Sequence, residues 1–322
     1  MIKKIAVLTS GGDSPGMNAC VRAVVRTAIY HSIDVIGFLK GYEGLVDNNF
    51  LPLKRESVSG IIQKGGTFLK TARSERFRTQ EGMNKAVQHL KANGVEGLVV
   101  IGGDGSFRGA MELSRHANIP IVGCAGTIDN DLVGTDVAIG YDTAINTVVE
   151  AIDKIRDTAE SHERIFVVEV MGRDAGLIAV RSAIASGAEA LLVPELKNNP
   201  GQLIEKIKGW RSTKSSKIIV VAEGHENGAF KVAELIKHHC PEFDLRVSIL
   251  GHIQRGGNPS CMDRVNASVI GFNAVKAIMQ GRTKEMVGIV NKQIVYTPFE
   301  KAVKHHEKLN KDLEELIEIL SS

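Results

Sequence analysis

Short runs of Val, Ile and Leu recur along the chain, and most of them end in glycine and a polar residue. The runs largely lack polar alternation, which is typical of parallel strands buried on both faces. They are Ile5–Thr9, Val35–Leu39, Leu98–Ile101, Ile121–Cys124, Phe166–Val170, Leu191–Val193, Ile218–Ala222 and Val247–Leu250. Segments with helical spacing, such as Asn146–Thr158 and Gln202–Lys208, lie between them. This alternation predicts an α/β fold with helices on both faces of a sheet.

The bulk composition is that of an ordinary globular protein. A chain of 322 residues suggests two domains, because domains commonly hold about 100–200 residues. The net charge of +3 indicates neither a nucleic-acid nor a membrane partner. No Cys-x-x-Cys pair is present, so neither a zinc site nor a disulfide framework is indicated. The first residues lack a signal-peptide core, and we expect a cytoplasmic protein without membrane spans.

The residues that follow the predicted strands are the candidates for binding. Ligands of parallel α/β sheets bind at the carboxyl ends of strands. These ends carry Gly11-Gly12-Asp13, Gly102–Ser106, Gly126–Asp131, Met171-Gly172-Arg173, Glu223-Gly224 and Gly251–Gly257. We therefore expect these segments to converge on one polar crevice.

Two glycine-rich segments are candidates for phosphate binding. Gly11–Gly16 precedes a helix expected to begin near Pro15, whose free N–H groups attract phosphate. A tight turn without a ligand explains this pattern equally well. Gly102–Ser106 adds a carboxylate and a hydroxyl ahead of the predicted helix Gly109–His116, which suits a polyphosphate with Mg²⁺ held by Asp104. A glycine-rich turn with a helix-capping Asp is the alternative.

The two common nucleotide fingerprints are missing from the sequence. There is no GxxxxGK[ST] segment, so a P-loop enzyme is excluded. There is also no GxGxxG segment with an acidic residue at the right distance, which disfavours a dinucleotide oxidoreductase.

Thr127–Asp131 is the best candidate for chemistry. Asp129 and Asp131 follow a buried strand, and one of them can accept a proton from a substrate hydroxyl. A solvated acidic turn is the alternative. His252 can hydrogen-bond a phosphate and Glu223 a sugar hydroxyl, although a structural histidine and an ordinary ion pair fit them nearly as well.

Arginines cluster around the predicted strands. Arg173, Arg246 and Arg255 lie at or near the ends of apolar runs, and Arg164 just precedes one. The guanidinium fork binds phosphate through two contacts. Four arginines near converging strands therefore indicate an anionic ligand, with ordinary surface arginines as the alternative.

Taken in order, these segments resemble the bacterial ATP-dependent 6-phosphofructokinases. The strings that carry the resemblance are Leu8–Asn18, Ile101–Ser106, Gly126–Asp131, Glu169–Arg173 and Gly251–Gly257. Their order and spacing match along almost the whole chain. The resemblance implies the transfer of a phosphoryl group from ATP to the 1-hydroxyl of fructose 6-phosphate, the committed step of glycolysis.

The resemblance also assigns roles to residues. It implies Asp129 as the base, with Thr127 and Arg173 stabilising the transferred group. For ATP it implies Gly12, Arg73, Ser74, Gly103, Asp104, Gly105 and Ser106, with Asp104 serving Mg²⁺. For the sugar phosphate it implies Thr127, Ile128, Asp129, Arg164, Met171, Gly172, Arg173, Glu223, Arg246, His252, Ile253, Gln254 and Arg255.

The resemblance further implies a cytoplasmic homotetramer of two-domain subunits. Each domain is expected to be a three-layer αβα unit with a mainly parallel sheet, and the active site to lie in the cleft between them. The larger, ATP-binding domain is expected at about 1–140 plus 256–305, and the smaller, sugar-phosphate domain at about 141–255 plus 306–322. Arg164 and Arg246 would reach the 6-phosphate from a neighbouring subunit.

Two glycines indicate the phosphate donor. Pyrophosphate-dependent relatives commonly carry Asp in place of Gly105 and Lys in place of Gly126, so the resemblance favours ATP. A pyrophosphate-dependent enzyme and a non-catalytic nucleotide-sensing subunit are the alternatives. Intact Asp104, Asp129 and Arg173 argue against the second. A related acceptor such as tagatose 6-phosphate stays open.

The resemblance also implies an effector site for ADP and phosphoenolpyruvate. The matching residues are Arg22, Arg26, Arg55, Arg156, Gly187, Glu189 and Lys214. Ser212, Ser215 and Ser216 replace residues that are generally basic. Because charge-assisted contacts to phosphate are the strong ones, we expect weaker or altered allosteric control.

Overall fold

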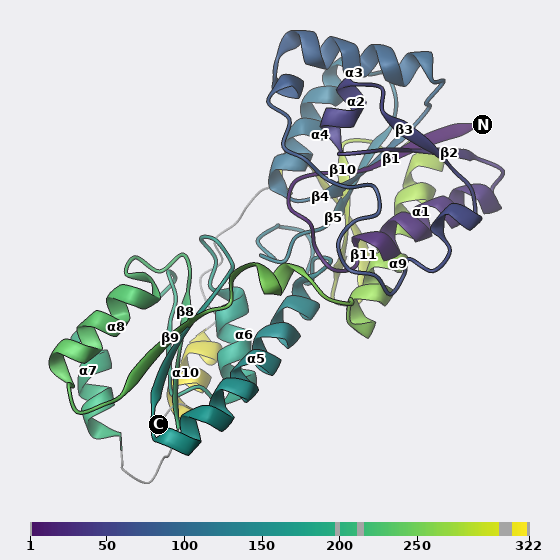
Figure 1. Ribbon diagram of the computed structural model, residues 1–322. Coiled ribbons are helices and arrows are strands. Elements are labelled where there is room, and N and C mark those ends of the chain that lie inside the picture. The colour runs from purple at the N-terminus through teal and green to yellow at the C-terminus, as the bar shows by residue number, and fades with distance from the viewer. Residues whose placement is uncertain (1, 197–199, 211–215, 303–310, 321–322) are drawn as a thin grey trace. The chain divides into compact units, whose positions relative to one another are not determined.

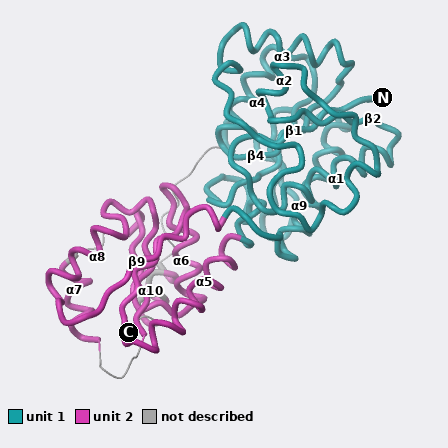
Figure 2. The backbone as a smooth tube through the Cα atoms, viewed as in Figure 1, with its two compact units in different colours: residues 1–143, 255–305 teal, residues 144–254, 306–322 magenta. Residues whose placement is uncertain are grey.

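The computed structural model describes residues 2–196, 200–210, 216–302 and 311–320. The chain forms two compact units (Figure 2). Unit 1 comprises Met1–Thr143 and Arg255–His305, and unit 2 comprises Ala144–Gln254 and His306–Ser322. The chain therefore passes from unit 1 to unit 2, returns, and enters unit 2 again near its C-terminus.

Unit 1 is built on a mostly parallel sheet, whose described strands run in the order β11-β10-β5-β4-β1-β2-β3 (Figure 1). The strands are β1 (Lys4–Thr9), β2 (Asp34–Phe38), β3 (Phe50–Leu53), β4 (Leu98–Gly102), β5 (Ile121–Ala125), β10 (Glu285–Val290) and β11 (Gln293–Pro298). The central strands are parallel, whereas the edge strands β3 and β11 pair antiparallel. The carboxyl ends of β1, β4 and β5 thus lie next to one another.

Helices cover both faces of this sheet. They are α1 (Met17–Tyr30), α2 (Tyr42–Val46), α3 (Gln80–Ala92), α4 (Asp104–His116) and α9 (Cys261–Met279), with short 3₁₀ turns η1 (Glu56–Val58) and η2 (Arg76–Arg78). Ile5 and Val7 of β1 pack in the core beneath α1 and α9, whereas Ala6 and Leu8 pack beneath α3 and α4. Successive side chains of a strand point to opposite faces, so an unbroken apolar run serves both cores.

Unit 2 has a smaller parallel sheet, with described strands in the order β7-β8-β6-β9. The strands are β6 (Ile165–Val170), β7 (Ala190–Leu192), β8 (Lys217–Ala222) and β9 (Leu245–Ile249). The helices are α5 (Tyr141–His162), which begins in unit 1, then α6 (Leu177–Ser186), α7 (Pro200–Gly209), α8 (Gly228–His239) and α10 (Lys311–Leu320). A 3₁₀ turn, η3 (Gly251–Arg255), follows β9.

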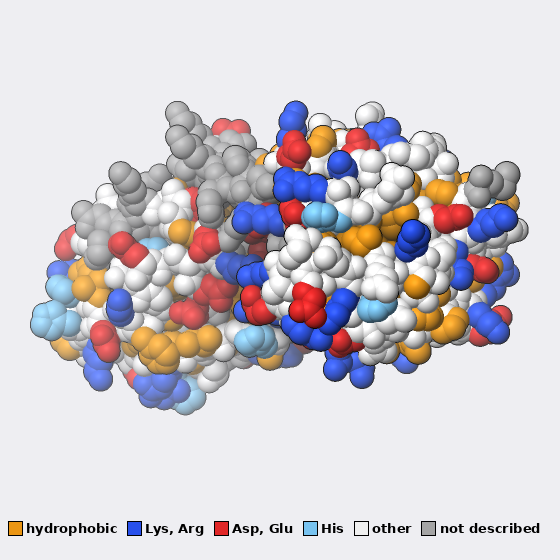
Figure 3. All heavy atoms as spheres, turned by 90° about the horizontal axis from the view of Figure 1, so that it is seen from above, with side chains coloured by type: hydrophobic (Ala, Val, Ile, Leu, Met, Phe, Trp, Pro, Cys, Tyr) orange, Lys and Arg blue, Asp and Glu red, His pale blue; other side chains and the backbone are white. Residues whose placement is uncertain are grey.

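The α/β fold with mainly parallel sheets is confirmed, and every apolar run named from the sequence forms a strand. Strands β3, β10 and β11 were not predicted. On the face shown in Figure 3, basic and acidic side chains are interspersed, in keeping with the net charge of +3. Within the described residues, no helix is both long and apolar enough to cross a membrane.

Candidate active site

Three neighbouring strands of unit 1 bring glycine-rich segments together at their carboxyl ends. A Cβ atom added to Gly11 would lie 3.3 Å from Ser106 Oγ, and one added to Gly103 would lie 3.6 Å from the Cβ of Thr127. The segments after β1, β4 and β5 therefore touch one another. Glycine at these positions leaves backbone exposed at a shared edge, where a ligand can approach closely.

The helices that follow two of these strands begin elsewhere than expected. Helix α1 begins at Met17, after Gly16 with a φ of 105°, so Pro15 lies outside the helix rather than in its first turn. Helix α4 begins at Asp104, not at Gly109, because Gly103 alone makes the turn from β4. Asp104, Gly105 and Ser106 thus form the first turn of a 13-residue helix, whose N-terminal N–H groups favour an anion.

The Asp104 carboxylate is paired with a basic side chain of its own helix. Arg108 Nε donates to Asp104 Oδ1 at 3.1 Å, and Arg108 Nη2 lies 3.0 Å from Asp104 Oδ2. The Arg108 side chain is 65% exposed, so it can turn away at little cost. Asp104 is therefore able to exchange this partner for a metal ion or its water shell.

The segment after β5 is fixed by its own side chains. Asn130, with a φ of 53°, accepts from Ala138 N at 2.6 Å and donates to Asp136 O at 3.0 Å. Asn tolerates this left-handed conformation better than most residues. Asp129 is 2% exposed, and Asp129 N donates to Thr127 Oγ1 at 3.2 Å. The Ile128 side chain is fully buried, so only its backbone can face a substrate.

The segment before α3 is hydrogen-bonded to the turn after β1 and to the first turn of α1. Thr71 Oγ1 donates to Gly11 O at 2.7 Å, and the Asn18 amide nitrogen donates to Lys64 O and Gly65 O at 3.1 and 3.2 Å. Arg73 follows closely and is exposed. The backbone of Arg73 is thereby held two residues from a contact with the Gly11 turn.

Arg255 lies against the Gly12 turn. Its Nη1 donates to Asp13 O at 3.1 Å, and a Cβ atom added to Gly12 would come within 2.5 Å of the same nitrogen. Because Gly12 has no side chain, the Arg255 guanidinium can lie against its backbone, and a ligand can also approach closely. Both glycine and arginine suit an anionic group.

In unit 2, Glu223 holds the segment that carries Arg173. Glu223 Oε1 accepts from Gly172 N at 3.2 Å and from Arg173 N at 2.7 Å. Gly172 and Arg173 have positive φ values of 145° and 53°, a strained pair that these bonds help to hold. One Glu223 oxygen is thus committed to the protein backbone.

Gln254 holds the same segment from the other side. Its side chain is fully buried, accepts from Met171 N at 3.2 Å and donates to Gly251 O at 3.0 Å. The preceding His252 and Ile253 are exposed. The loop after β9 therefore presents His252 while Gln254 fixes its backbone.

Arg164 and Arg246 lie at the opposite edge of the unit 2 sheet from Arg173. Arg164 precedes β6 and Arg246 is near the start of β9, whereas Arg173 follows the far end of the six-residue β6. Parallel strands place all their starts at one edge and all their ends at the other. Arg164 Nε donates to Asp244 Oδ2 at 2.6 Å, and Arg246 pairs with the same carboxylate. The pKa of Asp244 is lowered, and the hydrogen bond from Arg164 is the main cause.

The residues matched to an effector site are partly brought together. Arg156 Nη1 lies 3.4 Å from Glu189 Oε1, and Arg156 Nη2 donates to Gly187 O at 3.2 Å. Ser216 Oγ accepts from Arg156 at 3.1 Å. Arg22 and Arg26 share helix α1 of unit 1, where burial and then Arg26 lower the pKa of Arg22. Arg55 is exposed and directly precedes η1. Lys214, Ser212 and Ser215 lie outside the described residues.

Some residues that shape these segments were missed by sequence reasoning. Asn130 had a usable signal, since an Asn between two Asp residues often takes a left-handed turn. Arg108 had only its spacing of four from Asp104, which is common on exposed helices. Tyr42 and Glu43 of α2 carried no signal, because their partners are distant in the sequence.

Comparison with known proteins agrees with this geometry. The phosphofructokinase family matches residues 4–278. An ATP-dependent 6-phosphofructokinase of Cytophaga hutchinsonii is 52% identical over 322 residues, covering 99% of this chain and 98% of the relative. This chain belongs to the phosphofructokinase family. Another relative is the ATP-dependent 6-phosphofructokinase of a Thermoanaerobacter species. It is 51% identical over 321 residues, which cover 99% of this family member and all of the relative.

Solved phosphofructokinases share the fold of this family member. The Saccharomyces cerevisiae enzyme superposes with a TM-score of 0.88 at 38% identity, covering 99% of this chain and 47% of the yeast chain. This chain thus spans about half the length of the yeast one. A pyrophosphate-dependent phosphofructokinase of Marinobacter aquaeolei superposes with a TM-score of 0.85 at 21% identity, which shows likeness of fold alone.

Proposed function

We propose that this chain transfers the γ-phosphoryl group of ATP to the 1-hydroxyl of fructose 6-phosphate. The observation that carries the proposal is the meeting of three glycine-rich segments, from β1, β4 and β5, beside the buried Asp129. Relatives about half identical over nearly the whole chain are named ATP-dependent 6-phosphofructokinases, which supports this choice.

ATP would be held by unit 1. Gly12 and Gly103 bring backbone to the phosphates, and the first turn of α4 directs its N–H groups toward them. Arg73 adds a positive charge next to the Gly11 turn. Gly105 leaves room for the α-phosphate, because a Cβ atom there would meet nothing within 4 Å, and this absence of bulk favours ATP over pyrophosphate.

Asp104 would serve Mg²⁺ in this account. One carboxylate at the start of α4, beside the proposed phosphate site, fits a metal that takes one or two carboxylates and completes its shell with phosphate oxygens and water. The described residues contain no cluster of three or more His, Cys, Asp or Glu, so phosphate and water would supply the other ligands. Bound there, the ion neutralises charge on the phosphate oxygens.

Asp129 would act as the base. Its carboxylate accepts the proton of the sugar 1-hydroxyl while that oxygen bonds to the γ-phosphorus and the bond to the bridging oxygen of ADP breaks. Phosphoryl transfer has a loose transition state, so positioning and charge stabilisation do most of the work. Thr127 and Arg173 would stabilise the transferred group, and the rigid Asn130 turn keeps Asp129 in place.

The sugar phosphate would be held by Met171, Gly172, Glu223, His252 and Arg255. Gln254 would act by holding the Met171 segment, since its side chain is fully buried. Arg164 and Arg246 lie together on Asp244 at the opposite edge of the unit 2 sheet from Arg173. That placement suits the idea that they serve the active site of another subunit.

Self-association as a homotetramer is part of the proposal. Helix α9 exposes Met262, Val265, Val269 and Phe272, which are spaced along one side of the helix. A row of exposed apolar side chains is typical of an interface. Control by ADP and phosphoenolpyruvate through the Arg156–Glu189 cluster, and a cytoplasmic location, also belong to the proposal and rest on the family resemblance.

A coupled assay of the purified protein tests this function. Fructose 6-phosphate and Mg²⁺ are offered with ATP or with pyrophosphate, and formation of fructose 1,6-bisphosphate is followed through aldolase and a dehydrogenase. We expect turnover with ATP and little with pyrophosphate. Faster turnover with pyrophosphate would reassign the donor, and no turnover with either would refute the proposal.

A further inference from the structure

Helix α2 contacts both segments proposed to hold ATP. It follows Gly41, whose φ of 61° and close approach to Thr9 O seat the helix at the end of β1. Its first two residues, Tyr42 and Glu43, face different partners. One contacts the start of α4, and the other contacts the segment that carries Arg73.

Tyr42 fixes the start of α4. Its hydroxyl donates to Ser106 O at 2.6 Å, and its ring stacks on Phe77 with centroids 4.1 Å apart. A Cβ atom added to Gly109 would lie 2.9 Å from the Tyr42 ring. Tyr42 is buried, and burial raises its pKa, so the hydroxyl stays a hydrogen-bond donor.

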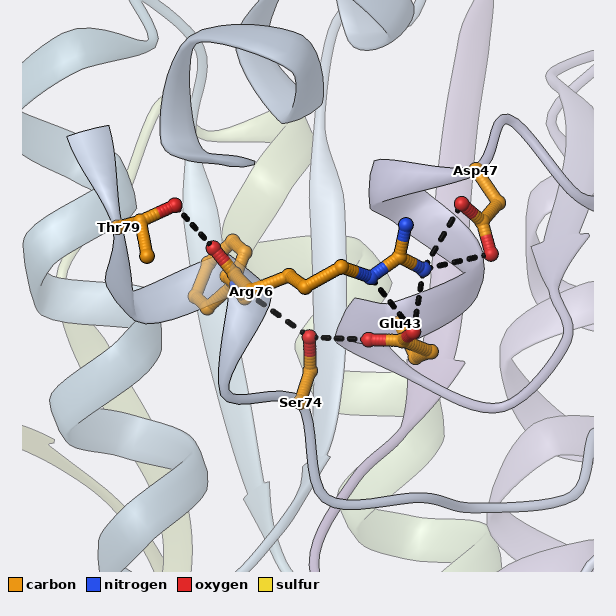
Figure 4. A network of polar contacts seen from close by, with 6 residues as sticks. Glu43, Asp47, Ser74, Arg76 and Thr79 are labelled. Atoms are coloured by element: carbon orange, nitrogen blue, oxygen red, sulfur yellow. Dashed lines mark hydrogen bonds and ion pairs between the residues drawn. The ribbon is translucent and has the colours of Figure 1, made fainter. Parts of the chain in front are cut away.

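Glu43 contacts Ser74 and Arg76, in the segment that follows Arg73 (Figure 4). Glu43 Oε2 accepts from Ser74 Oγ at 2.5 Å, and Oε1 accepts from Arg76 Nε at 2.9 Å. The Ser74 hydroxyl in turn accepts from Phe77 N at 3.1 Å. The bonds from Ser74 and then Arg76 lower the pKa of Glu43, so it is ionised at neutral pH.

The network continues to Asp47 and to the start of α3. Arg76 Nη2 lies 2.8 Å from Asp47 Oδ2, and Arg76 O accepts from Thr79 Oγ1 at 2.7 Å. Thr79 caps α3 by accepting from Gly82 N at 3.1 Å. Arg73 therefore sits between two anchors, Thr71 on Gly11 O and Ser74 on Glu43.

From this geometry we infer that Glu43 is a positioning residue for ATP, acting through Ser74 and Arg76 on the backbone of Arg73. The inference rests on the proposed function, because it takes Arg73 as an ATP contact. In it the Ser74 hydroxyl serves the Glu43 network rather than the nucleotide. Through Glu43 and Tyr42, helix α2 contacts both the Arg73 segment and the first turn of α4, and so fixes their relative positions.

The rival explanation is an ordinary surface ion pair. The Arg76 side chain is 52% exposed and that of Glu43 25%, and pairs this open usually contribute little to stability. Such a pair would change the melting temperature slightly and leave the kinetics alone. The two explanations therefore differ in the KM for ATP.

The test measures KM for ATP, KM for fructose 6-phosphate, kcat and melting temperature in Glu43→Ala and Glu43→Gln. Loss of an interaction that serves binding alone raises KM with kcat unchanged. We expect Glu43→Ala to raise KM for ATP about 5- to 10-fold, the effect of losing one ordinary hydrogen bond, because Glu43 acts on ATP only through the Arg73 segment. The KM of Glu43→Gln for ATP should lie between those of the wild type and Glu43→Ala, because the Gln amide oxygen can still accept from Ser74. KM for fructose 6-phosphate and kcat should change less than about twofold.

Glu150→Ala is the matched control, because Glu150 forms an exposed salt bridge with Lys154 at 2.6 Å within α5 and belongs to none of the segments proposed to hold ATP. It should keep the wild-type KM for ATP. Equal KM values in Glu43→Ala and the control would overturn the inference, as would a fall in kcat without a rise in KM. If Glu43→Ala does not fold, an unchanged KM in Glu43→Gln overturns it equally. An inactive wild-type protein would instead refute the proposed function.

Discussion

Replacing Gly105 by Asp should strongly reduce the use of ATP without unfolding the protein. Gly105 lies in the first turn of α4, where a Cβ atom would meet nothing within 4 Å. Asp is a somewhat better helix residue than Gly, and a carboxylate in a first turn gains about 0.3–1 kcal/mol from the helix dipole. Repulsion from the neighbouring Asp104 offsets part of this gain. We therefore expect a change in stability within about 1 kcal/mol.

The expected effect on ATP is much larger. A new carboxylate about 4 Å from a phosphate charge costs about 4 kcal/mol at the effective dielectric constant near a protein surface. Because about 1.4 kcal/mol is tenfold, kcat/KM for ATP should fall about 1,000-fold. The coupled assay measures this fall, and a thermal melt shows that the variant is folded.

Gly105→Ala is the control for this variant. It adds a methyl group without charge into the same open space, so kcat/KM for ATP should fall less than about tenfold. A folded Gly105→Asp that keeps kcat/KM within threefold would show that Gly105 is not beside the phosphates. Equal losses in both variants would show that bulk, rather than charge, is responsible.

Three further predictions follow from the same geometry. Asp129→Ser should cut kcat about 100- to 10,000-fold, the usual worth of a base, while calorimetry still detects ATP binding; unchanged turnover would remove Asp129 from the mechanism. Because Arg164 and then Arg246 lower the pKa of Asp244, the stability that this carboxylate contributes is present above its unfolded pKa and lost as the pH falls below about 4. The wild type should then melt above Asp244→Asn at pH 7, with the gap shrinking toward pH 3, and a gap independent of pH would contradict this. Titration of ADP and phosphoenolpyruvate should change activity weakly, and strong responses to both would contradict the expected loss of cations near Arg156.

The strands that the sequence predicts are those buried on both faces. An unbroken apolar run such as Leu98–Ile101, short, rich in β-branched residues and followed by glycine, favours a strand buried on both faces. The missed strands are different: β3 is a partly exposed edge strand that contains Pro52, which is tolerated only at a sheet edge. The hairpin of β10 and β11 turns at Asn291 and Lys292, both with positive φ. An Asn in a two-residue turn is a hairpin signal that could have been used.

The candidate site was predictable where it depends on residues close in sequence. Gly103, Asp104 and Ser106 stand directly after a strand, so the sheet alone places them. The arginines of unit 2 were predictable only in part, because the sequence places Arg164 before an apolar run and Arg173 after it but does not show the salt bridges of Arg164 and Arg246 with Asp244. Arg164 and Arg173 flank the same strand and therefore lie at opposite edges of the sheet.

Contacts between distant segments were beyond reach of the sequence. Glu43 and Ser74 are 31 residues apart, and Tyr42 and Ser106 are 64 apart. Only the folded sheet brings α2 against both segments. The same holds for Glu223, whose bonds to Gly172 and Arg173 span about 50 residues.

The central claim is that glycine-lined strand ends and Asp129 direct the γ-phosphoryl group of ATP onto one sugar hydroxyl. Phosphorus NMR of a mixture of the protein, Mg²⁺, ATP and fructose 6-phosphate tests it most directly, since it identifies both products and the carbon that gains phosphate. The account predicts ADP and fructose 1,6-bisphosphate in equal amounts, formed about 100- to 10,000-fold more slowly by Asp129→Ser. Release of inorganic phosphate alone, or phosphate at a carbon other than C1, would contradict it.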